Sequence, residues 1–177
     1  MKLPDFIRLA ENEPALEFLL IGGFAVAVHG YTRPTFDVDF LVRRSALEPW
    51  KTKLTGAGLS LFAERSAFAQ FSQGEGQDGL DLMLVDDHTF DLMAATAVTA
   101  NFDGMESRVV SLDNLLILKL HVLQQALPHR TGKDAGDVEE LLRRNRVALE
   151  SDHYRNLFLT YGDQNLYDTF RRLLRHR

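Results

Sequence analysis

The stretch Ile21–Val42, IGGFAVAVHGYTRPTFDVDFLV, decides the fold class of this 177-residue chain. It overlaps the apolar run Phe18–Ile21, which is too short for a helix and is followed by Gly22 and Gly23, a pattern typical of a buried strand that ends in a turn. Residues 24–29 are small and apolar and predict a short helix. The stretch therefore begins with a strand, a glycine turn and a helix.

Residues 36–42 alternate between two faces, which predicts a second strand. Side chains two apart in a strand point the same way, so Asp37 and Asp39 share one face. The other face carries Phe36, Val38 and Phe40. Two neighbouring carboxylates repel each other, and Mg²⁺ prefers carboxylate oxygens as ligands. The pair predicts a magnesium site, although a D-x-D pair can also simply face solvent.

The two glycines favour the metal interpretation. Glycine lets the backbone approach a ligand closely, and the N–H groups at the start of the following helix can bind a phosphate. Two Mg²⁺ ions about 3.5–4 Å apart stabilise the entering and leaving oxygens of a displacement at phosphorus. Gly22 and Gly23 beside Asp37 and Asp39 therefore predict chemistry on a phosphate ester.

Asp81 is the predicted third carboxylate of this site. It lies inside the hydrophobic run 80–85, LDLMLV, and points opposite to its apolar neighbours. The alternatives are at the ends of the run, where acidic residues are usually turn residues: Asp78, Asp86 and Asp87.

The rest of the chain predicts strands in the middle and helices at the end. Short strands are expected at about 59–63, 67–72 and 80–85, and helices at 4–17 (interrupted at Pro14), 45–57, 111–127, 133–145 and 151–175. Ser45 and Glu48 form a capping-box pattern at the start of the second helix. The predicted fold class is α/β (α+β), a mixed sheet flanked by helices, with a core over 1–110 and a helical region over 111–177.

Composition places the chain among globular proteins of a reducing compartment. It has no cysteine, which excludes disulfides and thiolate zinc sites. We expect no signal peptide and no membrane span, and a cytoplasmic location. The net charge is −5. The negative charge lies in residues 1–110, whereas the arginines of the C-terminal region are either a solvated helix face or a surface for a polyanion.

The first motif resembles the polymerase-β-like nucleotidyltransferase superfamily. Within it, the chain is most similar to AbiEii-type proteins, the nucleotidyltransferase toxins of abortive-infection and toxin–antitoxin systems. Their pattern is Gly-Gly or Gly-Ser, a short helix often holding a histidine, and then R-x-T-x-D-x-D. The matching positions here are Gly22, Gly23, His29, Arg33, Thr35, Asp37 and Asp39.

A second motif lies in Leu118–Leu141 and resembles the helical motif of the same family. That motif has a lysine on one helix, a basic residue near its end, and K-D-x-x-D on the next helix. The matching positions are Lys119, Arg130, Lys133, Asp134 and Asp137.

The resemblance implies an enzyme in which an acceptor hydroxyl attacks the α-phosphate of an NTP and releases pyrophosphate. The implied metal ligands for two Mg²⁺ ions are Asp37, Asp39 and Asp81. Implied nucleotide contacts are Gly22, Gly23, Arg33, Thr35 and Lys119, and Lys119, Asp134 and Asp137 join the catalytic set. One departure is that Gly23 stands where many active members carry a phosphate-binding serine.

Several of these residues have a simpler alternative role. Lys119 can extend from an apolar helix to water. Asp134 and Asp137 can complement the dipole of a helix N-terminus. Arg33 can pair with a neighbouring aspartate instead of a phosphate, and His29 is expected to be a hydrogen-bonded helix-end residue and not a metal ligand.

The predicted partners are an NTP, an RNA (tRNA) or protein acceptor, and a cognate antitoxin protein. Two alternatives stay open from the residues alone. One is transfer to a small hydroxylated molecule, and the other is a catalytically silent binding module with the same fold.

Overall fold

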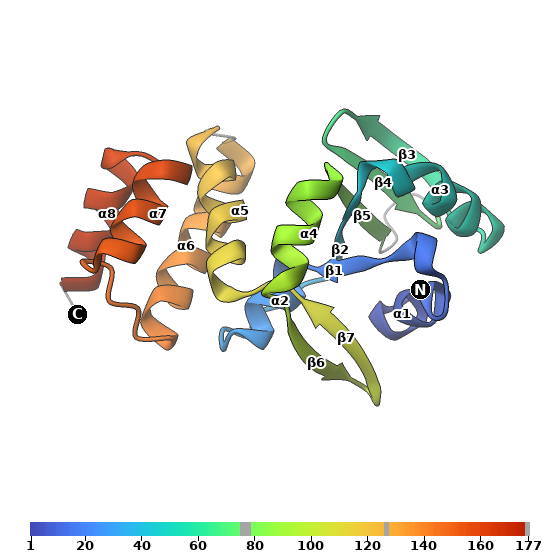
Figure 1. Ribbon diagram of the computed structural model, residues 1–177, viewed down its shortest axis with the longest axis horizontal. Helices are drawn as coiled ribbons and strands as arrows, with labels where there is room; N and C mark the ends of the chain where they lie inside the picture. Colours follow the sequence, from blue (N-terminus) through green and yellow to red (C-terminus); the bar gives the residue numbers. More distant parts are fainter. Residues whose placement is uncertain (75–78, 126–127, 176–177) are drawn as a thin grey trace. The chain divides into compact units, whose positions relative to one another are not determined.

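The computed structural model describes residues 1–74, 79–125 and 128–175, and for 128–131 the backbone alone. By their contacts these residues form two units (Figure 1). The first comprises 1–25 and 33–111, and the second comprises 26–32 and 112–177. Among the described residues, no helix has the length and apolar character needed to cross a membrane.

The first unit is built on a mixed sheet with the strand order β3-β4-β5-β2-β1-β7-β6. Its strands are β1 (Phe18–Leu20), β2 (Val38–Arg43), β3 (Ser60–Arg65), β4 (Phe68–Ser72), β5 (Gly79–Val85), β6 (Val98–Phe102) and β7 (Met105–Val109). The central strand β2 runs antiparallel to β1 and parallel to β5. The predicted class, a mixed sheet flanked by helices, is confirmed.

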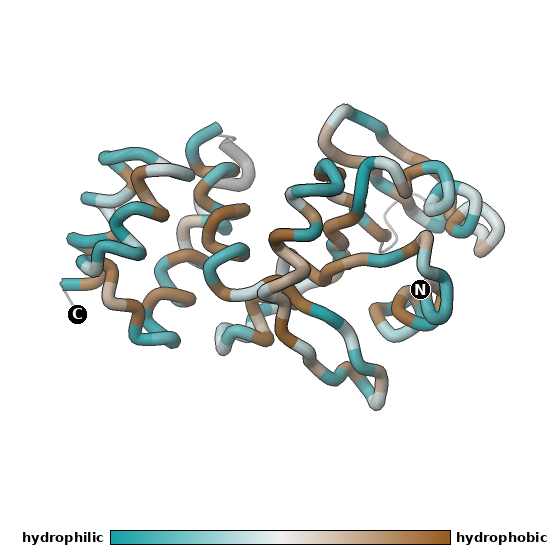
Figure 2. The backbone as a smooth tube through the Cα atoms, viewed as in Figure 1, coloured by the Kyte–Doolittle hydropathy of each residue, from teal (hydrophilic) through white to brown (hydrophobic). Residues whose placement is uncertain are grey.

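Helices cover both faces of this sheet. They are α1 (Leu3–Ala10), η1 (Pro14–Leu16), η2 (Arg44–Ala46), α3 (Leu47–Gly56), α4 (Asp87–Ala95) and the first turn of α2 (Gly22–Val28). On one face, Phe40 of β2 packs edge-on against Phe6 of α1 and Trp50 of α3. On the opposite face, the Arg43 guanidinium lies 4.2 Å from the centre of the Phe90 ring of α4. In Figure 2 hydrophobic residues run along the central strands between these helices.

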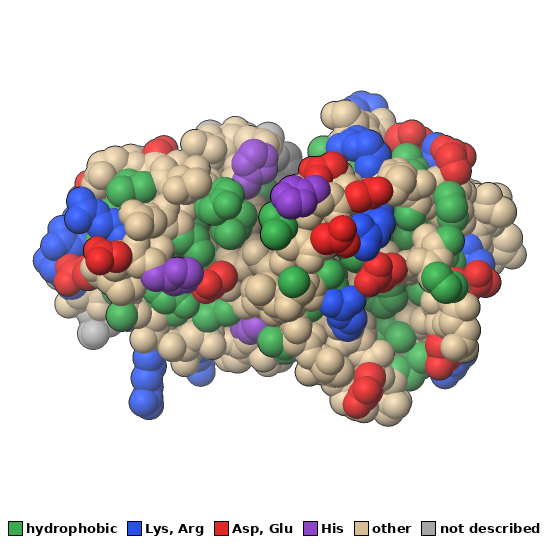
Figure 3. Space-filling model, viewed as in Figure 1, with side chains coloured by type: hydrophobic (Ala, Val, Ile, Leu, Met, Phe, Trp, Pro, Cys, Tyr) green, Lys and Arg blue, Asp and Glu red, His purple; other side chains and the backbone are tan. Residues whose placement is uncertain are grey.

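Ion pairs join the strands to α4 at the surface, where acidic and basic side chains alternate (Figure 3). Arg43 donates to Asp91 at 2.7 Å and to Glu17 at 3.1 Å, and Arg108 of β7 donates to Glu17 at 2.9 Å. The hydrogen bond from Arg43 to Asp91 is the main cause of a raised pKa of Arg43. Because these side chains remain partly exposed to water, we assign their ion pairs a small part of the stability.

Several local expectations differ from the structure. The sequence patterns did not predict helix α4 or the hairpin β6–β7. For β6 the reason is that it is a mostly exposed edge strand without regular alternation. The capping box at Ser45 is wrong: the Ser45 hydroxyl instead donates to Asp87 at 2.7 Å. Phe36 lies before β2 and is 75% exposed, so it does not share the buried face of Val38 and Phe40.

The second unit is helical. It contains α5 (Leu112–Gln124), α6 (Pro128–Arg144), α7 (Asp152–Tyr161) and α8 (Gln164–Arg175). Leucines of α5 and α6 form its core together with Phe158 and Phe170, whose rings meet edge-on at 5.8 Å. The segment 26–32 is attached to this unit, since the Asn145 amide donates to the His29 carbonyl at 2.9 Å.

Candidate active site at the start of strand β2

Asp39 and Asp81 lie opposite each other at the centre of the sheet. Asp39 of β2 is in register with Asp81 of β5 in a parallel pair, so their side chains point to the same face. Both are partly buried. Asp37 directly precedes β2 and is exposed. The strand register aligns Asp39 with Asp81, whereas the predicted position of Asp37 on the same face stays a prediction because Asp37 lies before the strand.

The Gly22–Gly23 turn is packed against this carboxylate group. Gly22 has φ +62°, which few residues other than glycine adopt. A Cβ atom on Gly22 would lie 1.9 Å from Asp39 Oδ2, and a Cβ atom on Gly23 would lie 2.4 Å from Thr35 Oγ1. The two glycines are therefore required because the Asp39 and Thr35 side chains occupy the space beside the backbone.

A side chain of the neighbouring strand β4 holds Asp81 in place. Gln70 of β4 is in register with Asp81, and its amide Nε2 donates to Asp81 Oδ2 at 2.9 Å. Sequence patterns did not indicate Gln70, because only the pairing of β4 with β5 brings it to the carboxylate.

The other acidic candidates for the third carboxylate have different roles. Asp86 is the N-cap of α4, and its carboxylate accepts hydrogen bonds from the backbone N–H and the hydroxyl of Thr89. These bonds lower the pKa of Asp86. Asp87 accepts from Ser45. Asp78 lies outside the described residues.

Arg33 and Thr35 belong to the loop that leads into β2. Arg33 Nη1 donates to the carbonyl of Pro34 at 3.3 Å, and Thr35 Oγ1 lies 3.5 Å from the carbonyl oxygen of Asp37. Thr35 also packs against Gly23, as described above. The loop thus joins the glycine turn to the first carboxylate, while the role of Arg33 stays a prediction.

Lys119, Asp134 and Asp137 form a buried cluster in the second unit. Lys119 Nζ donates to Asp134 Oδ1 at 2.8 Å and to Asp137 Oδ2 at 2.7 Å. The three residues are 6%, 7% and 1% exposed, so Lys119 does not extend to water. The two aspartates lie more than one turn after the start of α6 at Pro128, where the helix dipole has little effect.

Two further residues of the second motif, Arg130 and Lys133, have no described contact with this cluster. Lys133 is exposed. The side chain of Arg130 lies outside the described part of the chain. Of the five positions that the resemblance matches, the structure brings Lys119, Asp134 and Asp137 into contact.

The carboxylates at the start of β2 fit a hard cation by their chemistry. Within the described ranges, the side chains do not gather into a group of three or more His, Asp or Glu residues arranged to hold a metal ion. Asp37, Asp39 and Asp81 nevertheless offer only oxygen ligands, the type that Mg²⁺ prefers. Their role as metal ligands stays a prediction; Gln70 fixes the orientation of Asp81.

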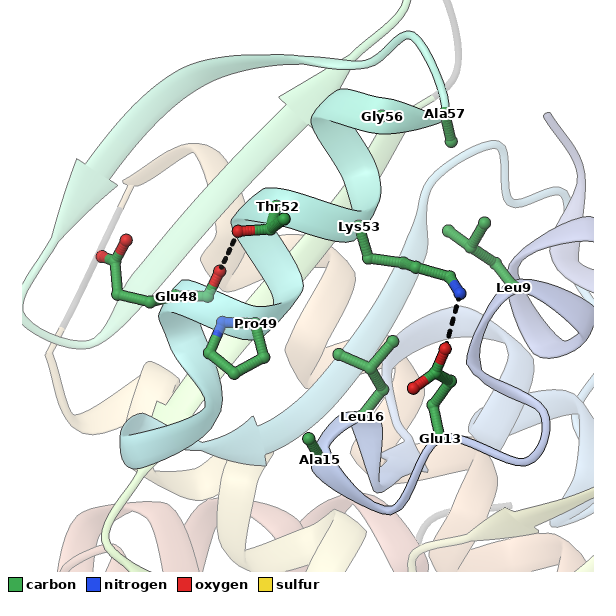
Figure 4. Close-up of a pocket in the computed structure, with 10 residues that line it drawn as sticks. All are labelled: Leu9, Glu13, Ala15, Leu16, Glu48, Pro49, Thr52, Lys53, Gly56 and Ala57. Atoms are coloured by element: carbon green, nitrogen blue, oxygen red, sulfur yellow. Dashed lines mark hydrogen bonds and ion pairs between the residues drawn. The ribbon is translucent and has the colours of Figure 1, made fainter.

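A separate pocket of about 680 Å³ lies between α1, η1 and α3 (Figure 4). Lys53 donates to Glu13 across it at 2.9 Å, and the rest of its wall combines apolar side chains such as Leu16 with the polar Glu48 and Thr52. None of the residues of the carboxylate group lines this pocket. We therefore do not assign the candidate chemistry to it.

Comparison with solved structures agrees with the topology described above. The antibiotic-resistance factor ANT(2'')-Ia has a TM-score of 0.60 at 16% identity, over 98% of this chain and 89% of that protein. This chain has the nucleotidyltransferase fold. The lincosamide adenylyltransferase LnuA has a TM-score of 0.55 at 14% identity, over 80% of this chain and 96% of LnuA.

A nucleotidyltransferase-like protein from Paracoccidioides brasiliensis also shares the nucleotidyltransferase fold. Its TM-score is 0.55 at 17% identity, over 95% of this chain and 91% of that protein. No family model matches the chain, and no curated protein matches it in sequence. The superfamily fold is therefore supported, whereas the AbiEii-type assignment remains a prediction.

Proposed function

We propose that the protein is a Mg²⁺-dependent nucleotidyltransferase that moves an NMP from an NTP to an acceptor hydroxyl. The observation that carries this proposal is the register of Asp39 with Asp81, beside a glycine turn that packs on Asp39. The nucleotidyltransferase fold supports it.

In this proposal the carboxylates bind the metal ions and the glycine turn binds the NTP phosphates. Asp37 and Asp39 would ligate both ions, and Asp81 would ligate the ion nearest the acceptor. Bound Mg²⁺ would neutralise the triphosphate and lower the pKa of the acceptor hydroxyl. The chain itself fixes the geometry: Gln70 orients Asp81, and the contact of Gly22 with Asp39 sets the distance from the carboxylate to the turn.

Two classes of acceptor are candidates. The resemblance of the motifs predicts an RNA (tRNA) or protein hydroxyl in a toxin–antitoxin setting. A small hydroxylated molecule is favoured by two observations. Two of the solved structures, ANT(2'')-Ia with adenylyl-2''-tobramycin and the lincosamide adenylyltransferase LnuA, are named as proteins that act on antibiotics. In addition, residues 1–110 carry 16 acidic against 9 basic side chains, a balance that disfavours a polyanionic acceptor.

The test is transfer from α-labelled NTPs with Mg²⁺, using total tRNA, tobramycin or lincomycin as acceptors. Wild type is compared with Asp39→Ala and with Asp152→Ala, a change of an exposed aspartate in the second unit. We expect label on one acceptor with wild type and Asp152→Ala, and none with Asp39→Ala. Label on the protein itself identifies a protein acceptor.

The absence of transfer to any acceptor, together with no Mg²⁺-dependent NTP binding by calorimetry, would overturn the proposal. The silent binding module with the same fold would then be the better account. Transfer that persists in Asp39→Ala would show that the chemistry lies elsewhere in the chain.

A further inference from the structure

The face of β4 that carries Gln70 is open to water, whereas its other face is sealed. On the sealed face, Ala69 and Phe71 are 0% and 2% exposed. On the open face, Phe68 is 39% exposed and Gln70 is partly buried. Because the Gln70 amide donates to Asp81, this open face is continuous with the face that carries the candidate carboxylates.

The strand register places Phe68 beside Asp81 on the open face. Gln70 stands directly opposite Asp81, and Phe68 and Ser72 lie two residues to either side of Gln70. Residues two apart on a strand point to the same face, and diagonal neighbours across an antiparallel pair lie about 7–8 Å apart. Phe68 and Ser72 are therefore the diagonal neighbours of Asp81, within reach of a molecule bound at its carboxylate.

Helix α4 covers a different part of this face. It packs on β2, where the Arg43 guanidinium lies 4.2 Å from the centre of the Phe90 ring. Strand β4 lies two strands away from β2, and there the side chain of Phe68 remains exposed. A single exposed apolar side chain is common on protein surfaces. What distinguishes Phe68 is its position in the sheet, diagonal to a predicted metal ligand.

On strands β3, β4 and β5, the open face carries one charge of each sign. The negative charge is that of Asp81. The positive charge is that of Arg65 on β3, which is exposed and in register with Phe68. Arg65 would repel a polycation at Phe68, and a polyanion needs several cations for its recognition. The chemistry that fits is a neutral molecule with an apolar ring for Phe68 and a polar group for Ser72.

We propose that the acceptor of the nucleotide lies on this open face and that Phe68 is a specificity-determining residue that packs against an apolar ring of the acceptor. The inference rests on the proposed function and specifies its substrate class. That class is a neutral small molecule in which the reacting hydroxyl and an apolar ring are about 7–8 Å apart. The hydroxyl lies at Asp81, the ring lies on Phe68, and the Ser72 hydroxyl binds a further polar group.

The first test measures binding and does not require turnover. The probes are phenyl β-D-glucopyranoside and methyl β-D-glucopyranoside, which share the hydroxyl groups and differ in the aromatic ring, together with tobramycin as a polycation. Saturation-transfer NMR on the full chain with Mg²⁺ reports which ligand protons contact the protein. We expect the phenyl protons to receive the strongest saturation, and both the methyl glucoside and tobramycin to bind more weakly than the phenyl glucoside.

The matched variants are Phe68→Ala and Val98→Ala. Val98 is also 39% exposed, but it lies on β6 at the opposite edge of the sheet. Loss of one ring contact should weaken binding of the phenyl glucoside about three- to tenfold in Phe68→Ala and leave it unchanged in Val98→Ala. Phe68→Leu, which keeps an apolar side chain, should give a smaller loss. NTP binding by calorimetry should be the same in all three variants, which shows that the site has kept its fold.

Equal binding of the two glucosides, or equal affinity of Phe68→Ala and Val98→Ala for the phenyl glucoside, would overturn the inference. Tighter binding of tobramycin than of the phenyl glucoside would also overturn it, because the acceptor would then be a polycation. In the transfer assay, Phe68→Ala should raise the KM of the acceptor and leave the KM of the NTP unchanged. Failure of the proposed function is a separate result, since it appears in wild type as the absence of both transfer and Mg²⁺-dependent NTP binding.

Discussion

The two units differ in how deeply their carboxylates are buried and in which groups donate to them. In the first unit, Asp39 and Asp81 are only partly buried, and the Asp81 carboxylate accepts from a neutral amide. In the second unit, Asp134 and Asp137 are buried almost completely, and both accept from the Lys119 ammonium. In the first arrangement a neutral amide donates to Asp81, whereas in the second a lysine of the chain pairs with both carboxylates.

The family motifs assign site roles to the aspartates of both units, but the surroundings of these aspartates differ. A buried ion pair compensates the loss of hydration of its own members, and removal of one member leaves an uncompensated charge. The carboxylate–lysine cluster therefore has a structural effect on its helices whatever else it does. The group at the start of β2 is better placed to bind a ligand.

The largest expected effect is that of Gly22→Ala on transfer. The new Cβ would lie 1.9 Å from Asp39 Oδ2, at a backbone φ of +62°. Either the turn or Asp39 must move, and a displacement of about 1 Å at a reacting centre can lower the rate on the order of 10²-fold. The measurement is kcat/KM for the NTP.

Gly56→Ala is the control for that substitution. Gly56 ends α3, and a Cβ there meets nothing within 4 Å. Its transfer rate should equal that of wild type. A Gly22→Ala enzyme with normal kcat/KM would show that the contact of the glycine turn with Asp39 is irrelevant to catalysis.

The next largest effect concerns stability of the second unit. Lys119→Ala leaves two buried aspartates without their ammonium partner, which should lower the free energy of unfolding by about 3–5 kcal/mol. Urea denaturation followed by circular dichroism measures it, with the exposed Lys133→Ala as the control. A loss of less than about 1 kcal/mol, with weaker NTP binding, would instead support the predicted nucleotide contact.

A smaller effect on transfer is expected from a change of Gln70, the residue of β4 that donates to the Asp81 carboxylate. Gln70→Leu removes the hydrogen bond to Asp81 Oδ2 and should reduce transfer about tenfold, since hydrogen bonds to charged groups contribute about 1.5–3 kcal/mol. Gln125→Leu, at an exposed position of the second unit, should not change the rate. Equal rates for both variants would remove Gln70 from the site.

The smallest expected effect is the pH-dependent contribution of Asp86. Because hydrogen bonds from Thr89 lower the pKa of Asp86 in the folded state, its stabilising effect is present above the pKa of the unfolded chain and is lost as the pH falls through the folded pKa. The Tm of Asp86→Ala should lie below that of wild type at pH 7, and the difference should fade below about pH 4. A difference that persists in strong acid would contradict the ionised cap.

Local patterns account for a large part of the fold. The alternation of residues 36–42 predicts β2, and the apolar run before Gly22 predicts β1, because a strand face has a period of two that a short window reveals. The edge strand β6 escaped prediction because it is mostly exposed and lacks such alternation. Phe36 was misplaced for a related reason: the alternation continues beyond the point where strand pairing begins.

The sequence by itself determined that Asp39 lies on a strand preceded by two glycines, and that helices follow from residue 111 onward. Only the tertiary structure decided that Asp81 stands opposite Asp39 with Gln70 beside it, that Lys119 is buried between two aspartates, and that Phe68 lies diagonal to Asp81 on the open face of β4. The physical reason is the distance along the chain over which the interactions act. The direction of a side chain in a strand and the position of a turn depend on neighbouring residues. The register of two strands and the burial of a side chain depend on packing between segments far apart in the chain.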